Sequence, residues 1–397
     1  MPEYYLKTKK IAKQVGFSKY HRFAQGKKTP FLIIDPQQVK KNLRQLQIAL
    51  PFANIFYALK ANPHPSIISL LAKEKCNFDI ASRYELDMLL KHKIKPERIS
   101  FGNTIKKVED IRYFYNKGVR LFATDSHSDL LKIARYAPKS KIFFRLLVDG
   151  EGADWPLSRK FGAHPDIIHE LARHAKKSGL IPYGVSFHVG SQQHDVEQWD
   201  QAIAQCKYLF ERLEKEGIRL ELLNLGGGLP SHYLSDSPSL EYYAKKITAS
   251  LSFHFGKNLP KIIIEPGRYL VGSAACLVSE IVLIAKKSKS MGCEWMYLDA
   301  GIWNGLDECE GEAMKYPIMT TIDSRKMKEF ILAGPTCDSH DILYEHFRYE
   351  LPSSIKEGDQ LFFLSTGAYT WQVSSVGFNG FPPLKVYILP QKNKTTK

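Results

Sequence analysis

The feature that most constrains the fold is a repeated alternation of strand-like and helix-like segments between about residues 30 and 270. Short β-branched or aromatic runs, such as NIFYALKA and CNFDIAS, precede longer stretches with helical spacing of apolar residues, such as PSIISLLAKEK and RYELDMLLKHK. This alternation is typical of parallel strands joined by crossover helices. Eight or so such units over about 240 residues favour a (β/α)8 barrel over an open doubly wound sheet.

The pattern changes after about residue 270, where short strand-like runs alternate with connections rich in Gly, Pro and Asn. The expected strands lie in LVSEIVLIAKKSK, CEWMYLDAG, EFILAGP, DQLFFLS, AYTWQVSS and PLKVYIL. These runs predict an all-β module after the barrel. We therefore expect a basic N-terminal segment at 1–29, the barrel at 30–270 and a C-terminal β domain at 271–397, which an N-terminal strand joins.

The formal net charge of +15 is concentrated at the two ends of the chain. Residues 1–30 contain eight Lys or Arg and one acidic residue, and the last seven residues, QKNKTTK, add three lysines. Ten of the fifteen charges therefore lie at the ends, and we interpret these ends as solvated basic segments. Because no aromatic-basic motif accompanies them, we expect neither nucleic acid nor a membrane as a partner.

Cysteine usage and the N-terminal sequence bear on the compartment. The six cysteines are scattered without a C-x-x-C pair, and MPEYYLKTKK lacks the apolar segment of a secretory signal. No run approaches the roughly 20 apolar residues of a membrane helix. We expect a reducing, cytoplasmic environment and no metal site.

Several chemically capable residues fall at the predicted carboxyl ends of barrel strands. They are Lys60, His188, Ser191, the triplet Gly226–Gly228, Glu265 and Arg268. A glycine triplet lets backbone N–H groups approach an anion, a guanidinium pairs with phosphate, and a lysine amine among apolar residues is a candidate nucleophile. Taken singly, each also has a structural explanation: a tight turn, a surface ion pair, a lysine reaching solvent, or a hydrogen-bonding histidine.

Together these residues indicate one chemistry. The carboxyl ends of barrel strands share one face, so the lysine, the imidazole, the glycine loop and the Glu–Arg pair should meet there. Pyridoxal phosphate needs a lysine to carry it, a partner for its pyridine nitrogen and a cradle for its phosphate. The sequence therefore predicts a pyridoxal-phosphate site.

The sequence also resembles a known family, the fold-type III pyridoxal-phosphate decarboxylases, and most closely the ornithine decarboxylases. The segments that carry the resemblance are YALKAN, FDIAS, SRKFGA, SFHVGSQ, LGGGLP, EPGRYLVG, GPTCDSHD, GAYT and FNGF. They occur in the family's order over residues 30–385. The resemblance implies an alanine racemase-like fold, with an N-terminal barrel and a C-terminal β domain, in homodimers with shared active sites.

The resemblance also implies a role for each matching residue. Lys60 would carry the cofactor covalently, His188 would stack on the pyridine ring, and Glu265 would bind the pyridine nitrogen. The other residues implied to contact the cofactor are Asp79, Arg145, Ser191, Gly226, Gly227, Gly228, Gly267, Arg268 and, from the other subunit, Tyr369.

Further roles implied by the resemblance concern the substrate and the dimer. Cys337 would protonate the product, and Asp338, with Tyr369, would contact the substrate, all from the other subunit. Lys160 and Asp341 resemble an ion pair between subunits.

The substrate is expected to be L-ornithine, giving putrescine for polyamine biosynthesis. Family enzymes for diaminopimelate typically carry Cys-Glu-Ser-Gly-Asp where this chain has Cys-Asp-Ser-His-Asp, and the shorter acid suits a distal ammonium. Ala300 stands where some members have a second acid for that ammonium. Lysine, or both lysine and ornithine, stays open as the substrate, because one methylene is worth only about 1–3 kcal/mol.

The sequence disfavours two functions other than decarboxylation. A racemase of the related barrel class is disfavoured, because CDSHD and GAYT follow the decarboxylase pattern. A non-catalytic homologue that binds a regulatory protein is disfavoured by the presence of Lys60, Glu265, Cys337 and Asp338.

Overall fold

The computed structural model describes residues 3–157, 159–288, 292–324 and 326–390, and the chain divides into two compact units. Residues 42–230 and 237–269 form one, here called the barrel unit. Residues 1–41, 231–236 and 270–397 form the other, here called the sheet unit. The sheet unit is therefore built from three separate parts of the sequence, of which one is the N-terminal segment.

Eight parallel strands close into a barrel in the order β10-β11-β2-β3-β4-β5-β6-β8. They are β2 (Ala53–Ala58), β3 (Asn77–Ile80), β4 (Ile99–Phe101), β5 (Leu121–Thr124), β6 (Lys141–Arg145), β8 (Ile181–Ser186), β10 (Leu222–Asn224) and β11 (Lys261–Ile264). The predicted (β/α)8 barrel is confirmed. A separate pair, β7 (Ala153–Trp155) and β9 (Ser191–Gln193), runs antiparallel.

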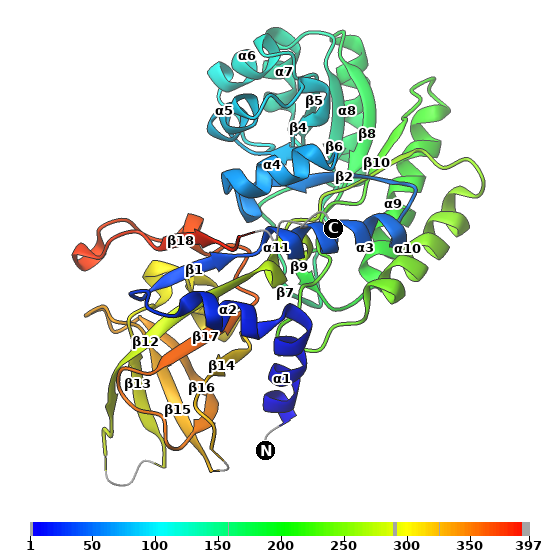
Figure 1. Ribbon diagram of the computed structural model, residues 1–397. Helices are drawn as coiled ribbons and strands as arrows, with labels where there is room; N and C mark the ends of the chain where they lie inside the picture. Colours follow the sequence, from blue (N-terminus) through cyan, green and yellow to red (C-terminus); the bar gives the residue numbers. More distant parts are fainter. Residues whose placement is uncertain (1–2, 158, 289–291, 325, 391–397) are drawn as a thin grey trace, which may run out of the picture. The chain divides into compact units, whose positions relative to one another are not determined.

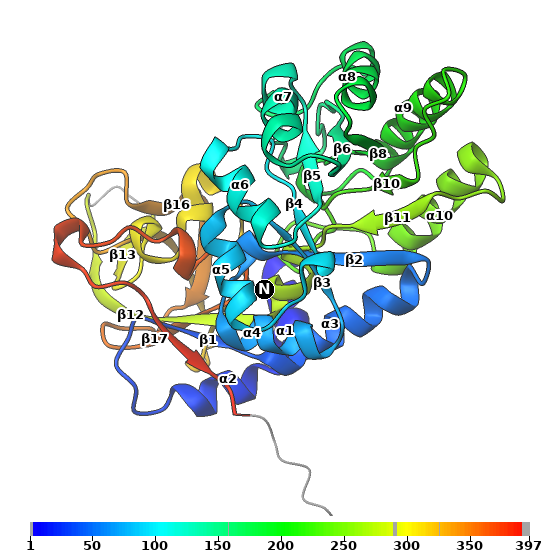
Figure 2. The ribbon, with the colours of Figure 1, turned by 90° about the horizontal axis from the view of Figure 1, so that it is seen from above.

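Helices follow the barrel strands and lie outside them, which Figure 2 shows for α6 to α10. Their bounds are α4 (Pro65–Lys73), α5 (Arg83–Lys91), α6 (Val108–Asn116), α7 (His127–Tyr136), α8 (Pro165–Lys177), α9 (Glu197–Glu214) and α10 (Leu240–Phe255), with 3-10 turns η1 (Leu59–Ala61) and η2 (Pro96–Arg98). α3 (Pro36–Ala49) precedes β2 along the chain, and α11 (Arg268–Val271) follows β11. Serines at positions 82, 126 and 239 begin α5, α7 and α10 by accepting a backbone N–H three residues on. Among the described residues, no helix is both long and apolar enough to cross a bilayer.

The interior of the barrel is filled by side chains from the strands. This cluster comprises Phe56, Ala123, Phe143, Tyr183, Leu222 and Ile263, all buried. A barrel packed in this way is a solid core, not a pore, so any chemistry must occur at its ends. The residues at the carboxyl ends of the strands are therefore the ones to examine.

Eight strands form the mixed sheet of the sheet unit, several of which are labelled in Figure 1. They are β1 (Phe31–Ile34), β12 (Ala275–Ala285), β13 (Glu294–Leu298), β14 (Ile318–Thr320), β15 (Met327–Ala333), β16 (Ile342–Pro352), β17 (Gln360–Leu364) and β18 (Lys385–Ile388). The 3-10 turns are η3 (Gly272–Ala274), η4 (Ile302–Asn304), η5 (Asp307–Glu312), η6 (Trp371–Val373) and η7 (Phe378–Gly380). β1 pairs antiparallel with β12 and parallel with β18, so the N-terminal strand-like run belongs to this sheet and not to the barrel.

One strand expected in the C-terminal region was wrong, and two strands, β14 and β16, were not expected. The run AYTWQVSS is no strand: it contains η6, and Tyr369 within it has a positive φ of 52°. Conversely, the 11-residue strand β16 was not expected from the sequence. Its charged residues, which include exposed Glu345 and His346, hide the apolar alternation, and its pairing with β15 contains register shifts.

The N-terminal segment is more ordered than a solvated basic end. It forms α1 (Glu3–Val15) and α2 (Phe17–Ala24), whose apolar face packs on the sheet. The buried cluster joins Ile11, Val15 and Tyr20 to Phe31 and Phe362 of the strands. The basic residues at positions 9, 10, 13 and 22 are exposed. The N-terminal segment is therefore solvated and basic on one face of its helices only. The basic segment QKNKTTK lies outside the described residues.

Candidate active site

Six of the eight barrel strands end at or just before a residue that the sequence singled out. Asp79 is the penultimate residue of β3 and Arg145 the last of β6. Lys60, His188, Gly226 and Glu265 follow β2, β8, β10 and β11 within two residues. Because the carboxyl ends of parallel barrel strands share one face, these residues lie on the same face of the barrel.

Lys60 lies in the turn η1 and not in the strand where the sequence placed it. Its side chain is exposed, whereas Leu59 and Ala61 on either side are fully buried and fix the turn. The strand-like run NIFYALKA therefore ends before Lys60, and the prediction that it extends through this lysine was wrong. Burial raises the pKa values of the Asp79 and Glu265 carboxyl groups, and the positive charge of Lys60 opposes this rise.

The two carboxyl groups at this face have perturbed pKa values. Burial raises the pKa of Glu265, and the hydrogen bond from Asn224 and the charges of Arg145 and Lys60 oppose this effect. Burial also raises the pKa of Asp79 well above its usual value, and the nearby carboxylate of Glu265 raises it further. Burial lowers the pKa of Arg145, while both carboxylates favour its charged form. The strand ends therefore hold a compact set of opposed charges, as functional sites often do.

Two polar residues that the sequence analysis missed hold these carboxylates. The Asn224 amide donates to Glu265 Oε1 at 2.5 Å and accepts the N–H of Gly226 at 2.9 Å through its Oδ1. The Ser100 hydroxyl donates to Asp79 Oδ1 at 2.7 Å. Asn224 directly precedes the LGGG segment, and an amide at the end of a buried strand was the signal that could have found it.

We expect Glu265→Gln to stabilise the ligand-free protein while removing its activity. Because burial raises the pKa of this carboxyl, its ionisation at neutral pH opposes folding, and a neutral amide keeps the Asn224 hydrogen bond without that cost. The free energy of unfolding should rise by about 1 kcal/mol in urea titrations. The gain should shrink as pH falls towards the usual carboxyl pKa, where the unfolded chain also takes up the proton. Glu109→Gln, at an exposed site, is the matched control and should change little; equal effects of both substitutions would contradict the account.

Arg268, Ser191 and the glycine loop provide donors for an anion. Arg268 is 4% exposed, and its Nε donates to Ser191 Oγ at 3.0 Å. A Cβ on Gly227 would lie 2.9 Å from the Glu265 carbonyl oxygen and 3.0 Å from His188 Nε2, so only glycine fits this loop. A guanidinium, a hydroxyl and a bare backbone loop are together the donor set that binds phosphate.

Gly267 allows two of these segments to pack closely. A Cβ at this position would lie 2.9 Å from the Cβ of Ala61. Glycine therefore lets the turn that carries Arg268 approach the turn that carries Lys60.

His188 is held as a neutral imidazole. Its Nδ1 accepts the Gly190 N–H at 3.1 Å, so the proton of the neutral ring resides on Nε2. Burial, followed by the charges of Arg145 and Lys60, lowers its pKa well below the usual value. A neutral imidazole next to Gly227 is suited to stacking on a flat ring of a ligand and not to pairing with an anion.

Three further predicted residues, Cys337, Asp338 and Tyr369, belong to the sheet unit. Cys337 and Asp338 lie in the loop between β15 and β16, and Tyr369 lies between β17 and η6. Cys337 is exposed, and Asp338 Oδ1 accepts the His340 N–H at 3.0 Å. The carboxylate of Asp338 is therefore oriented by its own loop.

The pair of Lys160 and Asp341 remains a prediction. Lys160 is exposed in the barrel unit, whereas Asp341 is 2% exposed in the sheet unit. The Asp341 carboxylate accepts the N–H of Ile302 at 2.8 Å and the N–H and hydroxyl of Thr336 at 3.1 and 2.7 Å. Its evident structural role is to hold the loop that carries Cys337.

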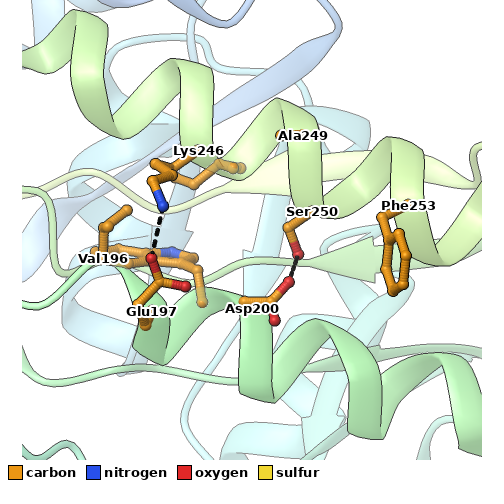
Figure 3. A pocket seen from close by; sticks show the side chains of 9 residues that line it. Val196, Glu197, Asp200, Lys246, Ala249, Ser250 and Phe253 are labelled. Atoms are coloured by element: carbon orange, nitrogen blue, oxygen red, sulfur yellow. Dashed lines mark hydrogen bonds and ion pairs between the residues drawn. The ribbon is translucent and has the colours of Figure 1, made fainter.

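A separate cavity of about 240 Å³ lies between α9 and α10 (Figure 3). Its polar residues are paired with one another: Lys246 with Glu197 at 2.8 Å, and Ser250 with Asp200 at 2.6 Å. None of the predicted site residues lines it. The cavity is therefore distinct from the strand-end cluster.

Comparison with known proteins identifies the family. Residues 36–272 match the model for the pyridoxal binding domain of the pyridoxal-dependent decarboxylases. The chain is 31% identical to a lysine/ornithine decarboxylase of Selenomonas ruminantium, over 89% of this chain and 88% of the relative, and 33% identical to the ornithine decarboxylase of Rattus norvegicus, over 92% and 82%. It also resembles the crystal structure of SrLDC in complex with PLP and cadaverine, with a TM-score of 0.84, 29% identity, and coverage of 95% of this chain and 93% of that one. The chain therefore belongs to the pyridoxal-phosphate-dependent decarboxylases with a barrel and a second, mostly β domain.

Proposed function

We propose that this protein decarboxylates L-ornithine to putrescine, a step of polyamine biosynthesis. The observation that carries the proposal is the Cys337-Asp338 pair, in which a thiol and a carboxylate are adjacent on one loop. A short carboxylate suits the distal ammonium of a diamino acid. The relatives named for ornithine and lysine support a basic amino acid as the substrate.

The residues at the barrel face fit pyridoxal phosphate. Arg268, Ser191 and Gly226–Gly228 supply donors for the phosphate, Lys60 supplies an exposed amine, and Glu265 supplies the acid for the pyridine nitrogen. His188, neutral and close to Gly227, suits the face of the ring. When bound, the cofactor would supply an electron sink for the electron pair that stays on Cα when CO₂ leaves. We propose Asp79, Arg145, Gly267 and Tyr369 as the remaining cofactor contacts.

The protein side chains then have distinct tasks. Glu265, held by Asn224, stabilises a proton on the pyridine nitrogen and so increases the electron demand of the ring. Cys337 delivers a proton to Cα after CO₂ has left. Asp338 holds the distal ammonium, because a cation in an enclosed site needs an anionic partner.

Asp338 is favoured over Asp299, the acid that precedes Ala300, because a carboxylate oxygen of Asp299 already accepts two hydrogen bonds. Asp299 Oδ1 accepts the Ser279 hydroxyl at 2.7 Å and the Glu280 N–H at 2.8 Å. Ala300, which replaces the acid of some relatives, is fully buried. These contacts support Asp338 as the acid that binds the distal ammonium and so selects the chain length of the substrate. Lysine is the second candidate substrate, because one relative is named for both lysine and ornithine.

CO₂ release from ornithine, lysine, arginine and diaminopimelate, measured in parallel with the cofactor-loaded protein, tests this proposal. We expect the highest kcat/KM with ornithine, and putrescine formed in equal amount to CO₂. No release from any of the four would instead favour a non-catalytic, partner-binding homologue. A protein of that kind would also lack the visible absorbance band of cofactor bound through Lys60.

We further propose a homodimer whose active sites are shared, with Lys60 from one subunit and Cys337, Asp338 and Tyr369 from the other. Inactive Lys60→Ala and inactive Cys337→Ala chains should then complement each other when mixed. Half of the randomly mixed dimers are heterodimers, and each contains one intact site, so about a quarter of the wild-type activity should return. Two differently tagged wild-type chains, co-purified, establish that subunits exchange. Exchange without recovered activity would mean that each site is built within one chain.

A reducing compartment is proposed for the protein. All six cysteines are free, and five of them are buried. Buried thiols without disulfide partners are typical of proteins from reducing environments.

A further inference from the structure

The side chain of Asn379 contacts Cys337 from a separate turn of the sheet unit. Asn379 lies in η7, forty-two residues beyond Cys337 along the chain. Its Oδ1 accepts the Cys337 N–H at 3.2 Å, and its amide atoms lie 3.4 Å (Nδ2) and 3.5 Å (Oδ1) from Cys337 Sγ. Backbone and thiol are thus both engaged by one amide.

We infer that Asn379 is a positioning residue for Cys337. Its amide holds the thiol in place and can hydrogen-bond to the sulfur both before and after the sulfur gives up its proton. This inference rests on the proposed role of Cys337 as the proton donor. Asn379 lies in the FNGF segment of the sequence resemblance, and the structure adds a specific role for it towards the thiol.

The backbone contact fixes the orientation of the Asn379 amide. A backbone N–H can only donate, so the amide oxygen must face Cys337 N–H and the Nδ2 group occupies the other position near sulfur. The protonated thiol can donate to Oδ1, and the thiolate can accept from Nδ2–H. When the S–H bond breaks and its proton moves to Cα, the electron pair stays on sulfur and finds a donor already in place. Sulfur then recovers a proton from solvent water.

The backbone of the turn is held in a conformation that aims this amide. Asn379 has a φ of 49°, a region that few residues other than Gly, Asn and Asp adopt readily. Gly377 and Gly380 on either side also have positive φ, and the Gly380 N–H donates to the Gly377 carbonyl at 2.9 Å. Backbone strain of this kind tends to occur at functional sites.

The turn is also tied to a second segment near Cys337. The rings of Phe378 and Trp303 lie 5.4 Å apart, and Ser375 donates to the Trp303 carbonyl through its N–H at 2.8 Å and its hydroxyl at 3.0 Å. The Trp303 ring lies 6.4 Å from that of His340, which is in the Cys337 loop. Asn379 is therefore fixed relative to Cys337 by contacts other than its own.

Alkylation of Cys337 by iodoacetamide, followed as a function of pH on the full-length protein, tests the inference. Cys337 is the one exposed cysteine of the six, so it should react first in the native state. In Asn379→Asp the oxygen that accepts the Cys337 N–H is kept and Asp tolerates the positive φ, but the donor is replaced by a negative charge. We expect alkylation about tenfold slower at mildly alkaline pH and a profile moved to higher pH, because the thiolate loses its donor.

Asn379→Gly removes all three contacts of the amide with Cys337 while keeping the backbone free to adopt a positive φ. It should slow alkylation about threefold and lower kcat about tenfold, with KM for ornithine within about twofold of wild type. Val376→Ala is the matched control, because this side chain lies in the same loop and is 81% exposed. It should leave the pH profile of alkylation and the kinetic constants unchanged.

The outcomes separate this inference from the proposed function. Unchanged alkylation profiles in both Asn379 variants overturn the inference, whatever the activity. Shifted profiles combined with full activity of Cys337→Ala would keep the contact but remove Cys337 as the proton donor. Shifted profiles with kcat lowered in the Asn379 variants and in Cys337→Ala support both.

Discussion

Replacing Lys60 by alanine should abolish turnover, lowering kcat by about 10⁴-fold or more. The substitution removes the exposed amine that follows β2, and Arg145 cannot take its place because a guanidinium does not deprotonate to a nucleophile. The measurement is CO₂ release from ornithine at saturating cofactor. The visible absorbance band of the bound cofactor should be lost as well.

Lys60→Arg is the matched control for this result. It keeps a positive charge opposite Asp79 and Glu265, so their environment and the folding of the barrel should be preserved. It should nevertheless be as inactive as the alanine variant. Substantial activity with an unchanged spectrum in either variant would contradict the assignment of Lys60.

Replacing Asp338 by alanine should lower kcat/KM for ornithine by about 2–5 kcal/mol, or roughly 30-fold to several thousand-fold. Most of the loss should appear in KM, because the distal ammonium would be enclosed without an anion while the cofactor site in the barrel unit stays complete. Steady-state kinetics with ornithine measures the loss in KM, and absorbance measures whether the cofactor still binds.

Asp338→Asn separates the charge of this side chain from its hydrogen bond. The amide oxygen can still accept the His340 N–H that orients the loop, but the negative charge is gone. The asparagine substitution should therefore lower kcat/KM for ornithine nearly as much as the alanine substitution. Ornithine kinetics that survive in both would mean that another residue holds the distal amine, and Glu308 would be the next to test.

Asp338→Glu addresses chain length. The longer acid should shorten the space for the substrate and lower activity on lysine more than on ornithine. Parallel kcat/KM values for the two amino acids decide this point.

The barrel was predictable because its strands and helices differ in local pattern. Apolar runs such as KIII at 261–264 and KIFFR at 141–145 are buried along almost their whole length, as parallel strands must be. β16 was missed because a long antiparallel strand with charged, exposed positions carries a weaker pattern. The packing of α1 and α2 on the sheet depends on contacts with Phe362, more than 330 residues away, which no local pattern reveals.

The sequence indicated those residues of the candidate site that are proposed to contact the cofactor or the substrate themselves. Lys60, His188 and Glu265 have side chains whose chemistry is rare at strand ends, so their positions stand out in a sequence. Asn224 and Asn379 hold another residue, and their roles become visible only in three-dimensional contacts, although Asn379 lies in the FNGF segment. The exposure of Lys60 was also misjudged, because the turn η1 begins one residue before it and carries it out of the strand.

Competition between ornithine and lysine measures the substrate preference of the protein in a single reaction. Equal concentrations of ornithine and lysine are supplied to the cofactor-loaded protein, and putrescine and cadaverine are quantified at low conversion, so their ratio equals the ratio of the two kcat/KM values. We expect an excess of putrescine of about 10-fold to 200-fold, which corresponds to about 1–3 kcal/mol for one methylene. An excess of cadaverine, or neither diamine, would contradict this expectation.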